Sequence, residues 1–208
     1  MRVVVTRPLG QEGELVWRLE QLGHDVVHCP LLEIEPLGDE PVDVEGYDWV
    51  IVTSPNGARE LLRRVRGRLP RVAAIGRATA DALGHADLVA RVSTQEGLLL
   101  ELPRPAGRVL FAAAEGARQL LVTELDADFL PLYRTRELRP EEAPAGDLCV
   151  LASASAARAL GALKTGMPAV SIGPETSRAA VEAGVEVAAE AETHDVDGLV
   201  AAVERVAL

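Results

Sequence analysis

The chain has few aromatic residues, only two cysteines and a shortage of basic side chains. Aromatics make up 3% of its 208 residues, so its cores must be aliphatic and offer little for stacking the bases of single-stranded nucleic acid. The net charge of -11 argues against nucleic acid and anionic membranes as partners, because both require a dominant positive field. Cys29 and Cys149 lie in strand-like runs and fit reduced thiols better than a disulfide framework.

Targeting and membrane signals are missing as well. The polar Thr6-Arg7-Pro8 interrupts the apolar start after a few residues, which leaves no hydrophobic region of a signal peptide. No apolar run approaches the roughly 20 residues of a membrane span. We therefore expect a cytoplasmic protein that contacts no membrane.

The motifs of several enzyme classes are absent. The sequence has no dinucleotide-binding G-x-G-x-x-G, no G-K-[ST] phosphate loop and no G-x-S-x-G nucleophile elbow. Its one lysine, Lys164, stands in a turn-like segment that does not favour Schiff-base chemistry. His24, His28 and Cys29 suggest a metal site, but in a strand the two imidazoles would lie about 13 Å apart, too far to share an ion. We expect no metal.

The stretch from Asp48 to Leu62 joins a strand, a loop and a helix. Trp49 to Val52 is an unbroken apolar run, which predicts a parallel strand covered on both faces. Thr53 or Ser54 can cap the next helix, and Pro55 suits its first turn. Free N–H groups at a helix start, beside the carboxyl end of a strand, favour anions and are a common ligand site.

This unit recurs about a hundred residues later, at residues 148–160. Residues 72–80 then pair with residues 169–177, each a short strand ending in Gly and followed by a Thr. Upstream, residues 3–32 parallel residues 109–133. The chain therefore reads as two alternating units, A, B, A, B, which predicts two α/β lobes.

Two segments, residues 31–37 and 131–138, are predicted to be extended. In each, charged and uncharged residues alternate after a proline. Acidic residues in the first would face basic residues in the second across an antiparallel pair of strands. From the residues alone, the lobes could be contiguous halves or nested, since both respect right-handed crossovers. The charged residues are Glu33 and Glu35 in the first segment and Arg134 and Arg136 in the second.

Short motifs follow a fixed order along nearly the whole chain. They are Thr6-Arg7-Pro8, Leu22-Gly23, Pro30-Leu31-Leu32, Tyr47-Asp48-Trp49, Thr53-Ser54-Pro55-Asn56, Ile75-Gly76 with Thr79, Leu132-Tyr133-Arg134-Thr135, Ile172-Gly173-Pro174 with Thr176, and Gly184. In order and spacing this set resembles the uroporphyrinogen-III synthase family of the tetrapyrrole pathway. Ser153-Ala154-Ser155-Ala156 departs from it, with alanine where the family often has a proline-containing turn.

The resemblance implies an α/β fold of two flavodoxin-like lobes, each a parallel sheet flanked by helices, joined by a two-stranded antiparallel hinge. The lobes would be nested: residues 1–34 and 139–208 form the first and residues 38–131 the second, with hinge strands at about 31–37 and 131–138. It also implies an enzyme without cofactors that binds hydroxymethylbilane in the cleft between the lobes. The enzyme closes it to uroporphyrinogen III with loss of water and inversion of the terminal pyrrole ring.

This substrate, a linear tetrapyrrole, carries eight carboxylates, which loop-to-helix N-termini can hold without added positive charge. The hydroxyl departs with help from the pyrrole's electrons, so positioning carries most of the catalysis. We expect a monomer, with at most transient contact with the preceding pathway enzyme. A non-catalytic two-lobed binding or regulatory protein and a sugar-phosphate enzyme are the alternatives; the latter needs an acid-base pair that no motif nominates.

Tyr133 is the candidate catalytic residue, as a hydrogen-bond donor to the departing hydroxyl or an orienter of the terminal ring; a packing role in the hinge is the alternative. For Arg7 the choice is between a carboxylate or phosphate clamp and a solvated loop charge. Six hydroxyl residues, Thr6, Thr53, Ser54, Thr79, Ser153 and Thr176, are expected to line one cleft. The predicted substrate-binding set comprises these six and Arg7, Asn56, Gly76, Ser155 and Gly173.

Overall fold

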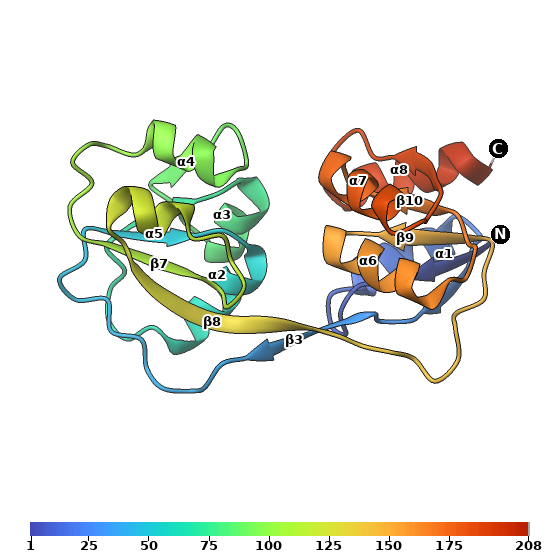
Figure 1. The fold of residues 1–208 in the computed structure, drawn as a ribbon, viewed down its shortest axis with the longest axis horizontal. Helices are drawn as coiled ribbons and strands as arrows, with labels where there is room; N and C mark the ends of the chain where they lie inside the picture. Colours follow the sequence, from blue (N-terminus) through green and yellow to red (C-terminus); the bar gives the residue numbers. More distant parts are fainter. Residues whose placement is uncertain (208) are drawn as a thin grey trace. The chain divides into compact units, whose positions relative to one another are not determined.

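The computed structural model describes residues 1–207, and the chain divides into two compact units (Figure 1). Unit 1 combines Met1–Glu33 with the C-terminal part from Arg136 onward, and unit 2 is Ile34–Thr135. The predicted lobes differ from these units only within the two hinge segments. Each unit is described below by itself.

Unit 1 is built on a five-stranded parallel sheet of order β11-β10-β9-β1-β2. The order reverses at β1, since β2 lies on one side of it and the later strands on the other. The elements are β1 (Arg2–Val5), α1 (Gly13–Gln21), β2 (Asp25–His28), β9 (Leu148–Leu151), α6 (Ala154–Leu163), β10 (Ala169–Ser171), α7 (Pro174–Glu182), β11 (Val187–Glu190) and α8 (Val196–Ala207).

Unit 2 repeats this plan on a six-stranded sheet of order β3-β8-β7-β4-β5-β6. Its strands are parallel except for the pair β3 and β8. The elements are β3 (Leu32–Pro36), β4 (Trp49–Val52), α2 (Pro55–Arg64), β5 (Arg71–Ala74), α3 (Arg77–Leu83), β6 (Leu88–Val89), α4 (Gln95–Glu101), β7 (Val109–Ala114), α5 (Leu120–Leu125) and β8 (Asp128–Glu137).

The central strands of both sheets are buried along their whole length, as their unbroken apolar runs predict. Every residue of β4 and of β9 is buried, because helices cover both faces of a parallel sheet. In unit 1, α6 and α7 pack on one face and α1 and α8 on the other. In unit 2, α2 and α3 occupy the face that corresponds to α6 and α7, while α4 and α5 take the other.

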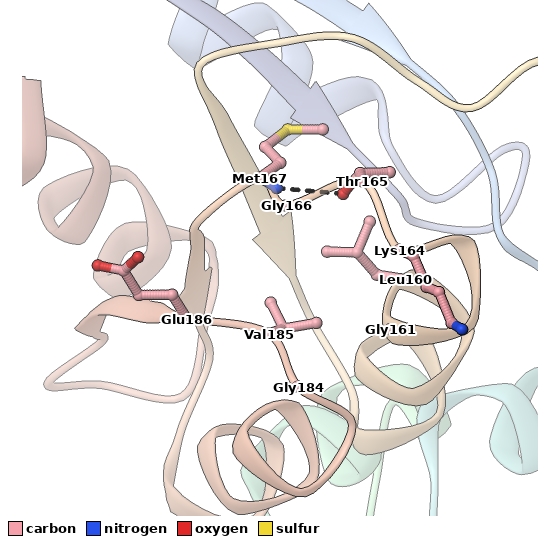
Figure 2. A pocket seen from close by; sticks show the side chains of 9 residues that line it. All are labelled: Leu160, Gly161, Lys164, Thr165, Gly166, Met167, Gly184, Val185 and Glu186. Atoms are coloured by element: carbon pink, nitrogen blue, oxygen red, sulfur yellow. Dashed lines mark hydrogen bonds between the residues drawn. The ribbon is translucent and has the colours of Figure 1, made fainter.

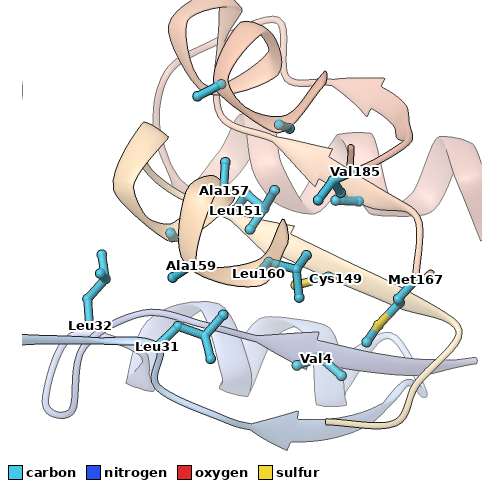
Figure 3. Packing of buried hydrophobic residues seen from close by; sticks show 14 residues of the cluster. Val4, Leu31, Leu32, Cys149, Leu151, Ala157, Ala159, Leu160, Met167 and Val185 are labelled. Carbon is cyan, nitrogen blue, oxygen red and sulfur yellow. The ribbon is translucent and has the colours of Figure 1, made fainter. Parts of the chain in front are cut away.

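The cores are aliphatic, as the shortage of aromatics requires. On the α6 and α7 face of unit 1, Leu31, Leu151 and Leu160 pack around the fully buried Cys149 (Figure 3). Burial raises the pKa of the Cys149 thiol far above its ordinary value, so it stays an uncharged core residue. The cysteines of the described chain are free thiols.

The hinge segments form the predicted antiparallel pair. The N–H of Leu37 donates to the carbonyl of Leu132, and the N–H of Leu138 donates to the carbonyl of Leu31. One residue number rises as the other falls, which defines antiparallel pairing. The charges also meet as predicted: Arg134 donates to Glu35 at 2.8 and 3.0 Å, and Arg136 donates to Glu33.

Candidate functional site

Each sheet has a switch point, where neighbouring strands continue in opposite directions across the sheet. In unit 1 it lies between β1 and β9, and in unit 2 between β4 and β7. Open α/β sheets bind ligands outside the carboxyl ends of the strands that flank this point, because the loops there diverge. The relevant loops are 6–12 and 152–153 in unit 1, and 53–54 and 115–119 in unit 2.

Ser54 lies beside the switch point of unit 2. It is extended and precedes Pro55, the first residue of α2, and its Oγ accepts the Gly57 N–H at 2.9 Å. The same Oγ lies 2.8 Å from the hydroxyl of Tyr133 on β8. A hydroxyl can donate one proton and accept two, so Ser54 caps the helix and pairs with the phenol at the same time.

Tyr133 lies at the inner end of this hydrogen-bonded chain. Its side chain is 6% exposed and packs in the core beneath α2 and α3. Burial raises the pKa of the phenol above its ordinary value, although the Ser54 hydroxyl pulls the other way. The group is therefore protonated at neutral pH and is a hydrogen-bond donor rather than a base.

Unit 1 has a counterpart in the first turn of α6. The Oγ of Ser153 accepts the Ala156 N–H at 3.2 Å, which is the cap of Ser54 repeated in the second unit. The alanine-containing turn therefore keeps a serine cap despite its departure from the family pattern. Corresponding arginines also point back to the first turns: Arg59 donates to Asn56 and Arg158 donates to Ser155, each three residues earlier.

Neither arginine is among the residues predicted from the sequence. Each arginine follows a polar residue by three positions on a predicted helix, at the same place in both repeats. This spacing could have revealed the pair from the sequence. They bring positive charge to the N-terminal turns of α2 and α6, where the helix dipole already favours anions.

Three of the predicted side chains are buried. Thr6, Thr79 and Thr176 are at most 4% exposed, so their hydroxyls face the interior of their own units. Thr6 donates to the carbonyl of Val150 at 2.9 Å and joins β1 to β9. Thr79 lies on α3 and Thr176 on α7, and packing of these helices on the sheets buries both side chains.

The remaining predicted side chains are all half-buried: Arg7, Thr53, Ser54, Asn56, Ser153 and Ser155. Thr53, Ser54 and Asn56 belong to unit 2 and the others to unit 1. That the predicted residues line one cleft stays a prediction.

Gly76 and Gly173 precede α3 and α7 and are buried. A Cβ on Gly76 would lie 2.6 Å from Oγ of Ser93, and one on Gly173 would lie 2.9 Å from the ring of His194. Both backbones are extended, so it is this close approach that requires glycine. The next βα loop therefore lies directly against the helix start in each unit.

The loop 115–119 after β7 also lies at the switch point of unit 2, and none of its residues is in the predicted set. Arg118 forms a two-pronged ion pair with Glu96 at 2.8 and 2.9 Å, and its carbonyl accepts a hydrogen bond from the buried Gln95. The Arg118 guanidinium is the main reason that the pKa of Glu96 falls to about 2. This loop corresponds to loop 6–12 of unit 1 in the repeat.

A pocket of about 210 Å³ lies elsewhere in unit 1 (Figure 2). Lys164, Met167 and Val185 line it beside the C-terminal end of α6. Met167 precedes β10 and Val185 precedes β11, so the pocket lies at the amino ends of the strands, away from the switch-point loops. Lys164 ends α6 in a left-handed conformation, with φ of 51°.

Within residues 1–207 no three His, Cys, Asp or Glu side chains gather in a way that could hold a metal ion. In the same part of the chain, no helix has both the length and the apolar character needed to cross a bilayer.

Comparison with known proteins identifies a single family. A family model described as uroporphyrinogen-III synthase HemD matches residues 13–201. The uroporphyrinogen-III synthase of Synechococcus elongatus is 25% identical, with 98% of this chain and 94% of that protein covered. The putative uroporphyrinogen-III synthase of Archaeoglobus fulgidus is 30% identical, with 96% of each chain covered.

Solved structures agree at the level of the fold. A mutant uroporphyrinogen III synthase from the extremely thermophilic bacterium Thermus thermophilus aligns with a TM-score of 0.67 and 21% identity, covering 100% of this chain and 98% of that one. The uroporphyrinogen-III synthetase of Helicobacter pylori aligns with a TM-score of 0.64 and 19% identity, covering 99% of this chain and 100% of that one. The two-unit α/β architecture is therefore shared.

Proposed function

Because the chain belongs to the uroporphyrinogen-III synthase family, whose members are hydro-lyases of tetrapyrrole biosynthesis, we propose that it closes hydroxymethylbilane to uroporphyrinogen III. The reaction breaks the bond between the terminal methylene carbon and its hydroxyl and joins that carbon to the terminal pyrrole ring at the other end of the chain. The ring gives up one proton, water is released, and the ring is inverted in the product. The observation that carries the proposal, beside the family match, is the pair of capped helix starts at the switch points, with the buried phenol of Tyr133 linked to one of them.

The helix starts account for how an acidic protein binds a substrate with eight carboxylates. The whole chain carries a net charge of -11, which repels a polyanion. The N-terminal turns of α2 and α6 offer local donors and the positive end of the helix dipole, and Arg59 and Arg158 add a charge to each. We assign substrate carboxylates to these turns and to Arg7.

Tyr133 has the protonation state that hydroxyl departure needs. As the carbon–oxygen bond breaks, the pyrrole nitrogen's electrons stabilise the carbon, and the departing oxygen takes up a proton to leave as water. A phenol that stays protonated at neutral pH can donate that proton. When Ser54 donates to the phenolic oxygen, the phenolic proton is available to the substrate; the serine thereby orients the donor.

Ring inversion follows from how the bound chain is folded. Either of two carbon atoms of the terminal ring can attack the reactive methylene carbon. Holding the ring in one orientation selects which of the two attacks. Side chains that only bind carboxylates contribute to this choice collectively, so their single substitutions should be mild.

A matched pair of substrates tests the proposal. Hydroxymethylbilane should be consumed in proportion to the protein added. The analogue in which hydrogen replaces the departing hydroxyl should be left unchanged and should inhibit competitively. If the protein does not speed the consumption of hydroxymethylbilane above the protein-free rate and the analogue does not bind, the chain is not the enzyme proposed.

A further inference from the structure

The first loop of unit 1, residues 6–12, is tied to the neighbouring strand through His28. His28 is the last residue of β2 and pairs in register with Val5, the last residue of β1. Its Nε2 lies 2.8 Å from the carbonyl oxygen of Arg7. Because a carbonyl oxygen only accepts hydrogen bonds, Nε2 carries the proton and donates it.

Glu12 lies on the other side of the same ring. Its Oε1 lies 3.9 Å from Nδ1 of His28, and both side chains are only about one-fifth exposed. Nearby backbone N–H groups, first that of Glu12 itself, and the His28 ring hold the pKa of this carboxyl below its ordinary value. The carboxylate therefore keeps its charge at neutral pH and faces the imidazole across the base of the loop.

Thr6, the residue before Arg7, is held by the sheet, since its carbonyl accepts the N–H of Leu31 at 3.3 Å and its hydroxyl donates to the carbonyl of Val150 at 2.9 Å. The N–H of Gln11 donates to the carbonyl of Pro8, which closes a local turn without reaching the sheet. The imidazole ties the start of the loop to β2, beside the switch point of unit 1. In unit 2 the corresponding loop is held in a similar way, since the buried Gln95 donates to the carbonyl of Arg118.

We propose that His28 is a positioning residue for the substrate: it holds the backbone of Arg7 so that the guanidinium meets a substrate carboxylate. This inference rests on the proposed function. Holding the loop before binding removes an ordering cost that would otherwise weaken the complex. The contact is remote from the reacting carbon, so its loss should raise KM and leave kcat almost unchanged.

Steady-state kinetics with hydroxymethylbilane test this with graded variants. His28→Ala should raise KM about fivefold, the effect of one lost hydrogen bond, with kcat within about twofold of wild type. His28→Gln keeps an N–H at nearly the same place and should restore most of the affinity. His85→Ala, which removes an exposed imidazole from unit 2, is the control and should behave as wild type.

A double-mutant cycle asks whether His28 acts through Arg7. If it does, Arg7→Ala combined with His28→Ala should lower kcat/KM no further than Arg7→Ala alone. If the losses in kcat/KM of the two single variants multiply in the double variant, the inference is overturned. An unchanged KM in a folded His28→Ala variant would also overturn it, as would a folded His28→Gln variant that is as impaired as the alanine variant. Wild-type protein that neither binds nor converts hydroxymethylbilane would instead refute the proposed function, and the inference with it.

Discussion

The hydroxyl of Tyr133 lies 2.8 Å from Oγ of Ser54, and that same Oγ caps α2 by accepting the Gly57 N–H. One serine thus joins a core residue of β8 to the start of a helix 79 positions earlier in the chain. Because it makes both hydrogen bonds, Ser54 should stabilise the protein more than a residue that only caps a helix.

We predict that Ser54→Ala costs about 2 kcal/mol of unfolding free energy, because it removes the cap and leaves the buried phenol without its partner. Ser153→Ala removes only a cap and should cost about 1 kcal/mol. Urea unfolding of both variants measures the difference. In a Tyr133→Phe background, the cost of Ser54→Ala should fall to that of Ser153→Ala; equal costs for the two serines in the wild type would contradict the coupling.

Tyr133→Phe should lower kcat about 10- to 100-fold while KM stays close to that of the wild type. This is the pattern of an interaction made mainly in the transition state, and the low end of general-acid effects suits a weak acid aiding a substrate-driven departure. Initial rates over a range of hydroxymethylbilane concentrations measure it. Full activity in this variant would make Tyr133 a packing residue of the hinge.

The ion pair of Arg118 with Glu96 should appear in the pH dependence of stability. The pKa of Glu96 is lowered from 4.5 to about 2, so the folded state binds its proton less readily than the unfolded state. The contribution is therefore complete above pH 4.5 and is lost as the pH falls toward 2. The Tm of the wild type should exceed that of Glu96→Gln above pH 4.5, and the gap should close toward pH 2. A gap that is constant with pH would contradict the ion-pair account.

Glycine at the start of α8 should not tolerate a side chain. A Cβ on Gly198 would lie 2.0 Å from the carbonyl oxygen of Thr193, whereas nothing lies within 4 Å of a Cβ on Gly13 at the start of α1. Gly198→Ala should therefore cost about 2 to 3 kcal/mol, and Gly13→Ala should be neutral or stabilising by up to about 1 kcal/mol. Thermal or urea unfolding of the pair decides this, and similar stabilities would show that the Thr193 backbone moves aside easily.

The order of strands and helices could be predicted because it depends on local patterns. The apolar run from Trp49 to Val52 and its repeat at Leu148 to Leu151 are buried strands. Ser54, one of the two predicted caps, is the residue that caps α2. The antiparallel hinge followed from complementary charges, Glu35 opposite Arg134. Periodicity, capping chemistry and charge pairing each depend on a few residues, so they can be predicted without knowledge of the tertiary packing.

The site was only partly predictable, because its details depend on contacts between distant residues. Thr79 and Thr176 have the same local signals as exposed helix-start residues, and only helix packing on the sheet buries them. His28 read as an ordinary strand residue, since its contact with Arg7 spans 21 positions. Arg59, in contrast, stands three residues after Asn56, and that local spacing could have revealed it.

The isomer composition of the product tests the central claim most directly. Hydroxymethylbilane supplied to the purified protein should give uroporphyrinogen III, resolved as the oxidised porphyrin, in an amount that grows with protein concentration. A protein-free control, in which the chain closes without inverting its terminal ring, should give the symmetric isomer I. An isomer ratio that is the same with and without the protein would contradict the account.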